Sequence, residues 1–99
     1  MGARWKTTRV SDFWFVYLLE CSDGSYYCGI AKDVASRVAV HKAGKGSKYV
    51  ASRLPIRDVV AVSPPFRTRS RASIIEAKVK GLSRDKKVAA VTEPSILEG

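Results

Sequence analysis

Two short aromatic runs, separated by a tight turn, lie near the start of the chain. Residues 14–19 are aromatic and branched, as in a strand that is buried on both faces. Residues 26–30 form the second run, and Ser22-Asp23-Gly24-Ser25 stands between the two. An Asp-Gly pair between apolar runs strongly favours a β-hairpin. The fold is therefore expected to begin with two antiparallel strands.

Cap residues predict a helix after the hairpin. Asp33 precedes residues 34–42 and Gly44 follows them, which is typical of an N-cap, a short amphipathic helix and a C-terminal glycine. Residues 44–55 are interpreted as a basic loop. A third strand is predicted over residues 56–62, where two prolines follow.

Two further helices are predicted after the third strand. Thr68 or Ser70 can cap a helix that keeps apolar residues at helical spacing and ends near Gly81. Ser83 can cap a shorter helix that reaches about residue 91. The order β-β-α-β-α-α predicts an α/β (α+β) fold, in which helices flank a three-stranded antiparallel sheet.

The chain is short and strongly basic. Its 99 residues include 18 Lys and Arg against 9 Asp and Glu, which gives a formal charge of +9, and 45% of the residues are hydrophobic. That hydrophobic content is typical of a folded domain, and the charge favours a polyanion, nucleic acid before membrane. We expect a flexible arm at residues 1–12, one domain at 13–91 and a C-terminal tail at 92–99.

Several classes of protein are disfavoured by the composition. The sequence has no apolar run near the roughly 20 residues that span a bilayer and no signal-peptide core, so we expect a cytoplasmic protein with no membrane contact. Two cysteines cannot build a disulfide scaffold. A single histidine without a CxxC pair does not support a structural zinc site.

Three residues beside apolar helix faces have the chemistry of a phosphodiester site. Arg37 and His41 are four residues apart and so share one face of the first helix. Glu76 borders the apolar stripe of the second helix. A guanidinium, an imidazole and a carboxylate can supply charge stabilisation, proton transfer and a metal ligand. Taken singly, Arg37 is more often a solvated charge and His41 more often a structural histidine, and Glu76 could simply border its apolar stripe.

The two aromatic runs strengthen this interpretation. Phe15-Val16-Tyr17 and Tyr27-Cys28-Gly29 are followed in order by Arg37, His41 and Glu76. With these motifs in this order, the chain resembles the GIY-YIG nuclease superfamily, named for two short tyrosine motifs on adjacent strands. The resemblance covers roughly residues 13–90 and is closest to the small stand-alone YhbQ-like branch.

The resemblance implies a metal-dependent hydrolase of DNA phosphodiester bonds. Glu76 would hold one divalent ion, Mg²⁺ or Mn²⁺, at a phosphate oxygen. Tyr17 or His41 would accept a proton from the attacking water. Arg37 would offset the charge that develops on phosphorus, and Tyr27 would orient water or phosphate. These five residues are the expected catalytic site.

A shared site also sets a condition on the hairpin turn. If Tyr17 and Tyr27 serve one site, their side chains must point to the same face of the sheet. A three-residue loop over residues 22–24, with its glycine left-handed, meets this condition by pairing Leu19 with Tyr27. A two-residue Asp-Gly loop would separate the tyrosines.

The two cysteines, Gly29 and the absence of asparagine also bear on the comparison with the superfamily. The three-residue loop sends Cys21 and Cys28 to opposite faces, so both are expected to be free thiols. Gly29 is expected to let the backbone pass close to the first helix or to substrate. Many members of the superfamily also use an Asn late in the domain, and this sequence contains no Asn.

Basic residues are concentrated after the first helix and at the start of the second. We expect contacts to the phosphate backbone there, with Tyr49 available for base stacking. The expected nucleic-acid-binding residues are Lys42, Lys45, Lys48, Tyr49, Arg53, Arg69 and Arg71. The sequence offers no base-reading helix, so binding is expected to depend on nucleic-acid structure.

The sequence thus predicts a structure-selective endonuclease of DNA repair or processing, with DNA favoured over RNA. Two alternatives stay open. One is a nucleic-acid-binding module on the same fold with weak or no catalysis. The other is a protein-interaction subunit that lends the fold to a larger complex.

Overall fold

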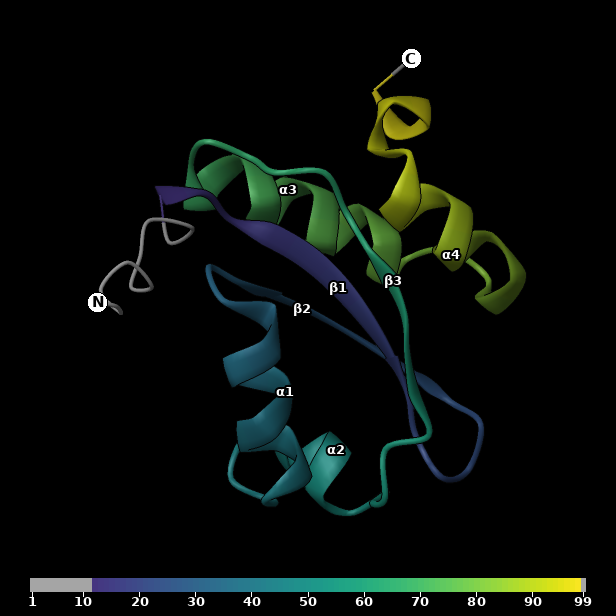
Figure 1. Cartoon of the computed structure of the whole chain (residues 1–99). Helices are drawn as coiled ribbons and strands as arrows, with labels where there is room; N and C mark the ends of the chain where they lie inside the picture. The colour runs from purple at the N-terminus through teal and green to yellow at the C-terminus, as the bar shows by residue number, and fades with distance from the viewer. Residues whose placement is uncertain (1–11, 99) are drawn as a thin grey trace.

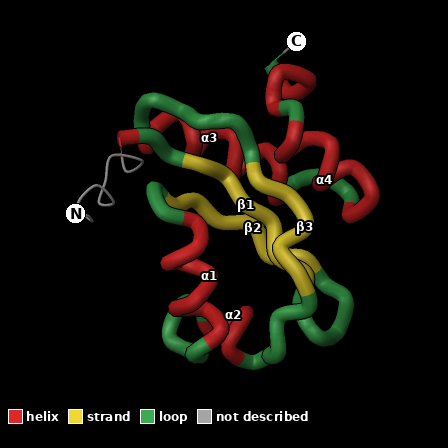
Figure 2. The backbone as a smooth tube through the Cα atoms, in the orientation of Figure 1, coloured by secondary structure: helices red, strands yellow, loops and turns green. Residues whose placement is uncertain are grey.

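The computed structural model describes residues 12–98 as one sheet with helices on both faces (Figure 1). Figure 2 shows the three strands side by side, in the order β2-β1-β3, and both pairings are antiparallel. The elements are β1 (Phe15–Glu20), β2 (Tyr26–Ala31), α1 (Val34–Lys42), α2 (Lys48–Ala51), β3 (Asp58–Val62), α3 (Arg69–Lys80), α4 (Arg84–Thr92) and a 3-10 helix, η3 (Pro94–Leu97). The predicted fold class is confirmed.

Side-chain alternation along β1 builds one core on each side of the sheet. Val16 and Leu18 point to the side that α3 and α4 cover, where they pack with Ile75. Tyr17 and Leu19 point to the side of α1 and α2 (Figure 1). Because β1 is central and buried on both faces, its sequence is apolar from Phe15 to Leu19 instead of alternating.

The turn between β1 and β2 is the three-residue loop that the sequence predicts. Leu19 pairs with Tyr27, and the Cys21 amide donates to the Ser25 carbonyl oxygen over 2.8 Å. Gly24 has a φ of 84°, the left-handed conformation that this loop requires. The predicted register is therefore confirmed.

Cys21 and Cys28 are free, as predicted, and are buried in different cores. Each therefore packs as a small apolar side chain. No helix among residues 12–98 is long and apolar enough to cross a membrane.

The predicted helices are present, and side-chain caps fix where two of them begin. The Ser36 amide donates to the Asp33 carboxylate over 3.1 Å at the start of α1. Thr68, and not Ser70, caps α3, because its hydroxyl oxygen accepts from the Arg71 amide over 3.1 Å. Thr68 therefore fixes the start of α3, the helix that carries Glu76.

Two segments differ from the sequence prediction. Residues 48–51, expected in a basic loop, form α2, because the Ser47 hydroxyl accepts from the Val50 amide over 3.1 Å and the Val50 side chain is fully buried. β3 begins at Asp58, two residues later than predicted, because Ile56 packs against the core beneath α1 and α2. With α2 and the 3-10 helix η3, the element order has two short helices that the sequence did not suggest.

The chain continues beyond α4 as a single turn. In η3, Pro94 is buried and Leu97 packs against the core beneath α3 and α4. The expected flexible arm, residues 1–12, lies outside the described residues except for Asp12.

Candidate active site

Tyr17 lies at the centre of the candidate site, on the middle strand and pointing toward α1. Its ring crosses Gly29, its partner on β2, so closely that a Cβ there would lie 2.5 Å from the Tyr17 hydroxyl oxygen. Glycine at this position makes room for the phenol. The close neighbour of Gly29 is thus the Tyr17 ring, whereas the sequence suggested the first helix or substrate.

His41 comes from the last turn of α1 and is fully buried beneath the loop that leads to α2. Its Nε2 is 2.9 Å from the Tyr17 hydroxyl oxygen, and its Nδ1 is 3.4 Å from the Ser47 amide nitrogen. Because an amide N–H can only donate, Nδ1 is the acceptor, and the proton of neutral His41 is assigned to Nε2. His41 therefore donates to Tyr17.

Gly46 makes this arrangement of His41 possible. A Cβ at Gly46 would lie 2.3 Å from the His41 Nδ1 atom. Only a glycine lets the backbone approach the imidazole closely enough for the next amide to face Nδ1. The two glycines, Gly29 and Gly46, thus hold the Tyr17–His41 pair from opposite ends.

Arg37 brings positive charge to the same place from one turn earlier on α1. Burial raises the pKa of Tyr17 to about 12, the neighbouring Tyr27 adds to the increase, and the Arg37 guanidinium opposes it. Burial and the Arg37 charge together lower the pKa of His41. At neutral pH the site thus holds a neutral imidazole and a protonated phenol beside a guanidinium.

Tyr27 lies at the solvent edge of this cluster, on the edge strand β2. Its half-buried ring meets the His41 ring edge-on, with centroids 5.2 Å apart. On another side it stacks with Tyr49 of α2, with centroids 6.1 Å apart and an interplanar angle of 29°. The structure therefore brings four of the five expected catalytic residues together: Tyr17, Tyr27, Arg37 and His41.

Glu76 approaches from the other helical layer. Its side chain is 21% exposed, and the Lys80 ammonium is 3.4 Å from its carboxylate. Burial raises the pKa of Cys28 to about 12, and the Glu76 charge contributes to the increase. Glu76 belongs to α3, whose residues Ile75 and Val79 pack on the face of the sheet opposite Tyr17, and Lys80 of the same helix reaches the edge of β2.

A hollow at that edge connects the two parts of the site. It has a volume of about 270 Å³ and is lined by Tyr26, Tyr27, Cys28, Tyr49 and Lys80. Tyr27 comes from the phenol cluster, and Lys80 is the ion-pair partner of Glu76. Substrate bound in this hollow would touch groups from both helical layers.

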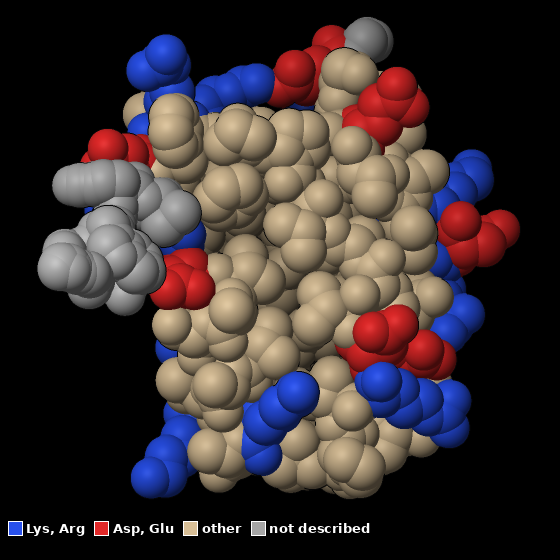
Figure 3. Space-filling view, in the orientation of Figure 1, with Lys and Arg blue, Asp and Glu red and all other residues tan. Residues whose placement is uncertain are grey.

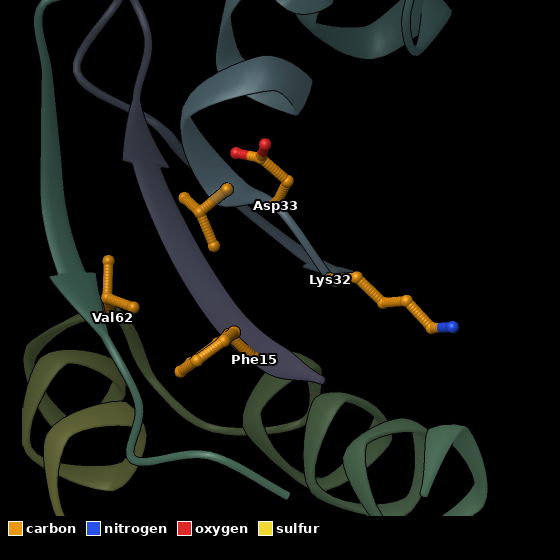
Figure 4. Close-up of a pocket in the computed structure, with 5 residues that line it drawn as sticks. Phe15, Lys32, Asp33 and Val62 are labelled. Carbon is orange, nitrogen blue, oxygen red and sulfur yellow. The ribbon is translucent and has the colours of Figure 1, made fainter. Parts of the chain in front are cut away.

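A second hollow lies at the start of α1, on the Tyr17 side of the sheet. Figure 4 shows Phe15 and Val62 beside it and Lys32 extending away from it. Val34 and the Asp33 cap complete the lining. Its walls include none of the five expected catalytic residues.

The expected nucleic-acid-binding residues fall into two groups. In the part of the chain that the structure describes, Lys42, Lys45 and Lys48 are within 4 Å of no carboxylate. Arg53 instead pairs with Asp23, and Tyr49 packs between Arg53 and Tyr27.

The remaining two expected binding residues stand at the start of α3, in the other helical layer. Arg71 pairs with Glu98 and Arg69 lies over the Trp14 ring. In Figure 3 most of the visible central face is uncharged, with Lys and Arg around its rim. The lysines at and after the end of α1 are therefore the expected cations with the fewest internal contacts.

Sequence reasoning missed three contributors to the site. Gly46 and Ser47 contact the His41 ring, and Lys80 faces Glu76. Lys80 follows Glu76 by four residues, a spacing that indicates an ion pair on a helix. No comparable signal in the sequence marks Gly46 or Ser47, because the contact depends on how the loop folds back.

Comparison with known proteins agrees with this geometry. The family model of the GIY-YIG catalytic domain matches residues 13–89. The chain belongs to the GIY-YIG nuclease superfamily.

Within that superfamily, the chain is similar to small proteins of the UPF0213 group. It is 47% identical over 76 residues to the UPF0213 protein of Cupriavidus pinatubonensis, covering 77% of this chain and 82% of the relative. Identity to the UPF0213 protein of Streptococcus pneumoniae is 39% over 79 residues, covering 80% and 78%. The solution NMR structure of the UPF0213 protein BH0048 from Bacillus halodurans is 40% identical, covers 87% of this chain and 83% of that chain, and has a TM-score of 0.45. The resemblance to the YhbQ-like branch is confirmed.

Proposed function

We propose that the protein is a metal-dependent endonuclease that hydrolyses DNA phosphodiester bonds in a structure-selective manner. In this proposal it acts in the cytoplasm, in DNA repair or processing. The observation that carries the proposal is the environment of the Tyr17 hydroxyl. It accepts a hydrogen bond from His41 and faces the charge of Arg37, and the neighbouring Tyr27 lines a hollow together with Lys80, the ion-pair partner of Glu76. Family membership supports the reaction class.

Tyr17, as the phenolate that forms when its own proton is lost to solvent, is the proton acceptor in this proposal, and His41 is not. Both ring nitrogens of His41 are engaged, Nδ1 by the Ser47 amide and Nε2 by Tyr17, so the imidazole has no free lone pair for a water molecule. His41 and Arg37 both act on the Tyr17 oxygen in the sense that stabilises a phenolate. His41 is then a positioning residue, and Arg37 stabilises negative charge.

Glu76 fits a divalent cation that keeps most of its own water. It offers one half-buried hard oxygen donor, and Mg²⁺ is commonly held by one or two carboxylates plus substrate phosphate. Among residues 12–98 there is no group of three acidic, His or Cys side chains that could hold a metal by themselves. A divalent cation there would supply positive charge at a non-bridging phosphate oxygen. The Lys80 ammonium must move away from the Glu76 carboxylate before the cation can bind there.

The test is a nuclease assay with plasmid, single-stranded and forked DNA in the presence of Mg²⁺. Wild type is expected to cleave, and Glu76→Ala to lose cleavage by roughly 100-fold or more at unchanged DNA affinity. Glu93→Gln, an exposed carboxylate after α4, is the matched control and should cleave normally. Equal cleavage by wild type and Glu76→Ala would show that this site is not responsible.

A nucleic-acid-binding module with weak or no catalysis is the second candidate. Tyr17 and His41 are only 1% and 0% exposed, and Lys80 already neutralises Glu76, which also suits a site that binds without cutting. That candidate predicts salt-dependent DNA binding with no cleavage in any metal. Absence of salt-dependent binding would instead favour a protein partner.

A further inference from the structure

Tyr27 is held by ring packing alone within the described part of the chain, where its hydroxyl makes no hydrogen bond to protein. The His41 ring supports one side and the Tyr49 ring supports another. Since the His41 ring is itself fixed by two hydrogen bonds, the adjustable support is Tyr49. The orientation of Tyr27 therefore depends on what holds Tyr49.

Tyr49 stands on a weak element. α2 is a single helical turn, Lys48–Ala51, and a turn of this length is not stable by its own hydrogen bonds. Tyr49 is 39% exposed, so burial alone does not fix the position of its ring. Its ring needs a contact from outside α2.

Arg53 supplies that contact. Its guanidinium carbon is 3.7 Å from the centre of the Tyr49 ring, and one of its terminal nitrogens donates to the Tyr49 carbonyl oxygen over 3.1 Å. Its Nε donates to the Asp23 carboxylate over 3.1 Å. The Ser22 amide of the same hairpin turn donates to the Arg53 carbonyl oxygen over 3.0 Å. Arg53 thus ties α2 to the turn between β1 and β2.

The Asp23 carboxylate is itself fixed. Its second oxygen accepts from the Ser25 amide over 3.0 Å and also from the Ser25 hydroxyl. A rigid carboxylate therefore orients the planar guanidinium, which in turn covers one face of the Tyr49 ring. The same Tyr49 ring also stacks with Tyr27.

We propose that Asp23, Arg53 and Tyr49 form a bracket that positions the Tyr27 ring, and that Arg53 is a positioning residue instead of a contact to the DNA backbone. The inference rests on the proposed nuclease function, in which Tyr27 orients water or phosphate. It assigns Arg53 and Tyr49 a role different from the phosphate contact and base stacking that the sequence suggested.

The variant that separates the two roles is Arg53→Lys. It keeps the charge, and a backbone phosphate accepts lysine as readily as arginine, but a lysine cannot cover the Tyr49 ring and donate in a fixed fork. The bracket predicts that the single-turnover cleavage rate at saturating DNA falls by roughly tenfold or more, while DNA affinity and its salt dependence stay unchanged. Arg57→Lys is the matched control, because Arg57 pairs with Glu20 and lies over no aromatic ring among residues 12–98.

A phosphate-contact role predicts the opposite pattern. Arg53→Lys would then cleave like wild type, and Arg53→Gln would lose affinity and about one unit of salt slope at an unchanged saturated rate. Either of these results overturns the bracket.

A second measurement does not depend on cleavage. Proton NMR is expected to show nuclear Overhauser cross-peaks between the Tyr27 and Tyr49 rings in wild type and in Arg57→Lys. These cross-peaks should be lost in Arg53→Lys, while the rest of its spectrum remains that of a folded protein. Cross-peaks that persist in Arg53→Lys contradict the bracket. A wild-type protein that cleaves no DNA refutes the proposed function, and the NMR comparison then still decides the bracket.

Discussion

Two glycines define the site at the level of single residues, because each occupies a place where no other side chain fits. Gly29 lies under the Tyr17 phenol, and Gly46 lies against the His41 imidazole. Neither has a positive φ, so the requirement is one of space and not of backbone conformation. The two glycines therefore allow Tyr17 and His41 to lie within hydrogen-bond distance of each other.

Gly29→Ala is expected to destabilise the fold by about 1–3 kcal/mol, because the added methyl group would lie 2.5 Å from the Tyr17 hydroxyl oxygen in a packed core. Urea denaturation measures the change. Gly81→Ala is the matched control, since a Cβ there meets only a carbonyl oxygen at 3.6 Å. Equal stability of Gly29→Ala and Gly81→Ala would contradict the described packing.

His41 predicts a pH dependence of stability with a defined direction. Burial and Arg37 lower its pKa in the folded protein below the usual 6.5, so the unfolded chain binds a proton first as the pH falls. The free energy of unfolding should be at its full value above about pH 6.5 and decrease as the pH falls from there toward 5. The Asp23, Asp33 and Asp85 carboxyls have lowered pKa values and affect stability only at lower pH.

Urea denaturation at several pH values between 5 and 8 measures this effect. His41 is the single histidine of the chain, so His41→Gln should remove the dependence in this window. A decrease of the same size in His41→Gln would show that another group causes it.

At the level of elements, the hairpin and the capped helices could be predicted and α2 could not. The condition that Tyr17 and Tyr27 share a face was enough to select the bulged loop, and Asp33 and Thr68 cap the helices that they precede. α2 has four residues, too few to show periodicity, and depends on the Ser47 cap and on the burial of Val50 in the folded core.

The same distinction holds for the site. Residue types and order identified Tyr17, Arg37, His41 and Glu76 as candidates before any geometry was known. The hydrogen bond from Ser47 that sets the His41 tautomer, and the pairing of Arg53 with Asp23 across 30 residues, depend on how the chain folds back. Local sequence patterns carry no information about such contacts.

The cap of α3 gives a prediction for an element. Thr68→Ala should destabilise the protein by about 1 kcal/mol, because the Thr68 hydroxyl oxygen accepts from the Arg71 amide at the helix start. Ser83→Ala at the start of α4 should cost less, since Ser83 makes no side-chain cap hydrogen bond there. Thermal or urea unfolding of the two variants compares them directly, and the reverse order would contradict the assigned caps.

For the whole molecule, the question is where its charge of +9 acts. Four carboxylates make five ion pairs with basic side chains around the structure, whereas Lys42, Lys45 and Lys48 have no such pairing among residues 12–98. These three follow His41 along the chain and lead into α2, next to the candidate site. The binding surface is therefore expected to adjoin the catalytic hollow.

Replacing the three lysines together with glutamine should reduce the slope of log affinity for DNA against log salt by about two to three units, because each phosphate contact contributes about 0.9. Fluorescence anisotropy over a salt series measures the slope. Lys86→Gln on α4, in the other helical layer, should leave it unchanged. An unchanged slope in the triple variant would place the binding surface elsewhere.

The central claim is that the Tyr17 oxygen accepts the proton in metal-dependent DNA cleavage, and the single-turnover rate of Tyr17→Phe at saturating DNA and Mg²⁺ tests it most directly. Because the pKa of Tyr17 is raised to about 12, the logarithm of the wild-type rate should increase with pH between 6 and 9. Tyr17→Phe should bind DNA normally and cleave roughly 100- to 10,000-fold more slowly. A variant that binds and cleaves like wild type would contradict the claim.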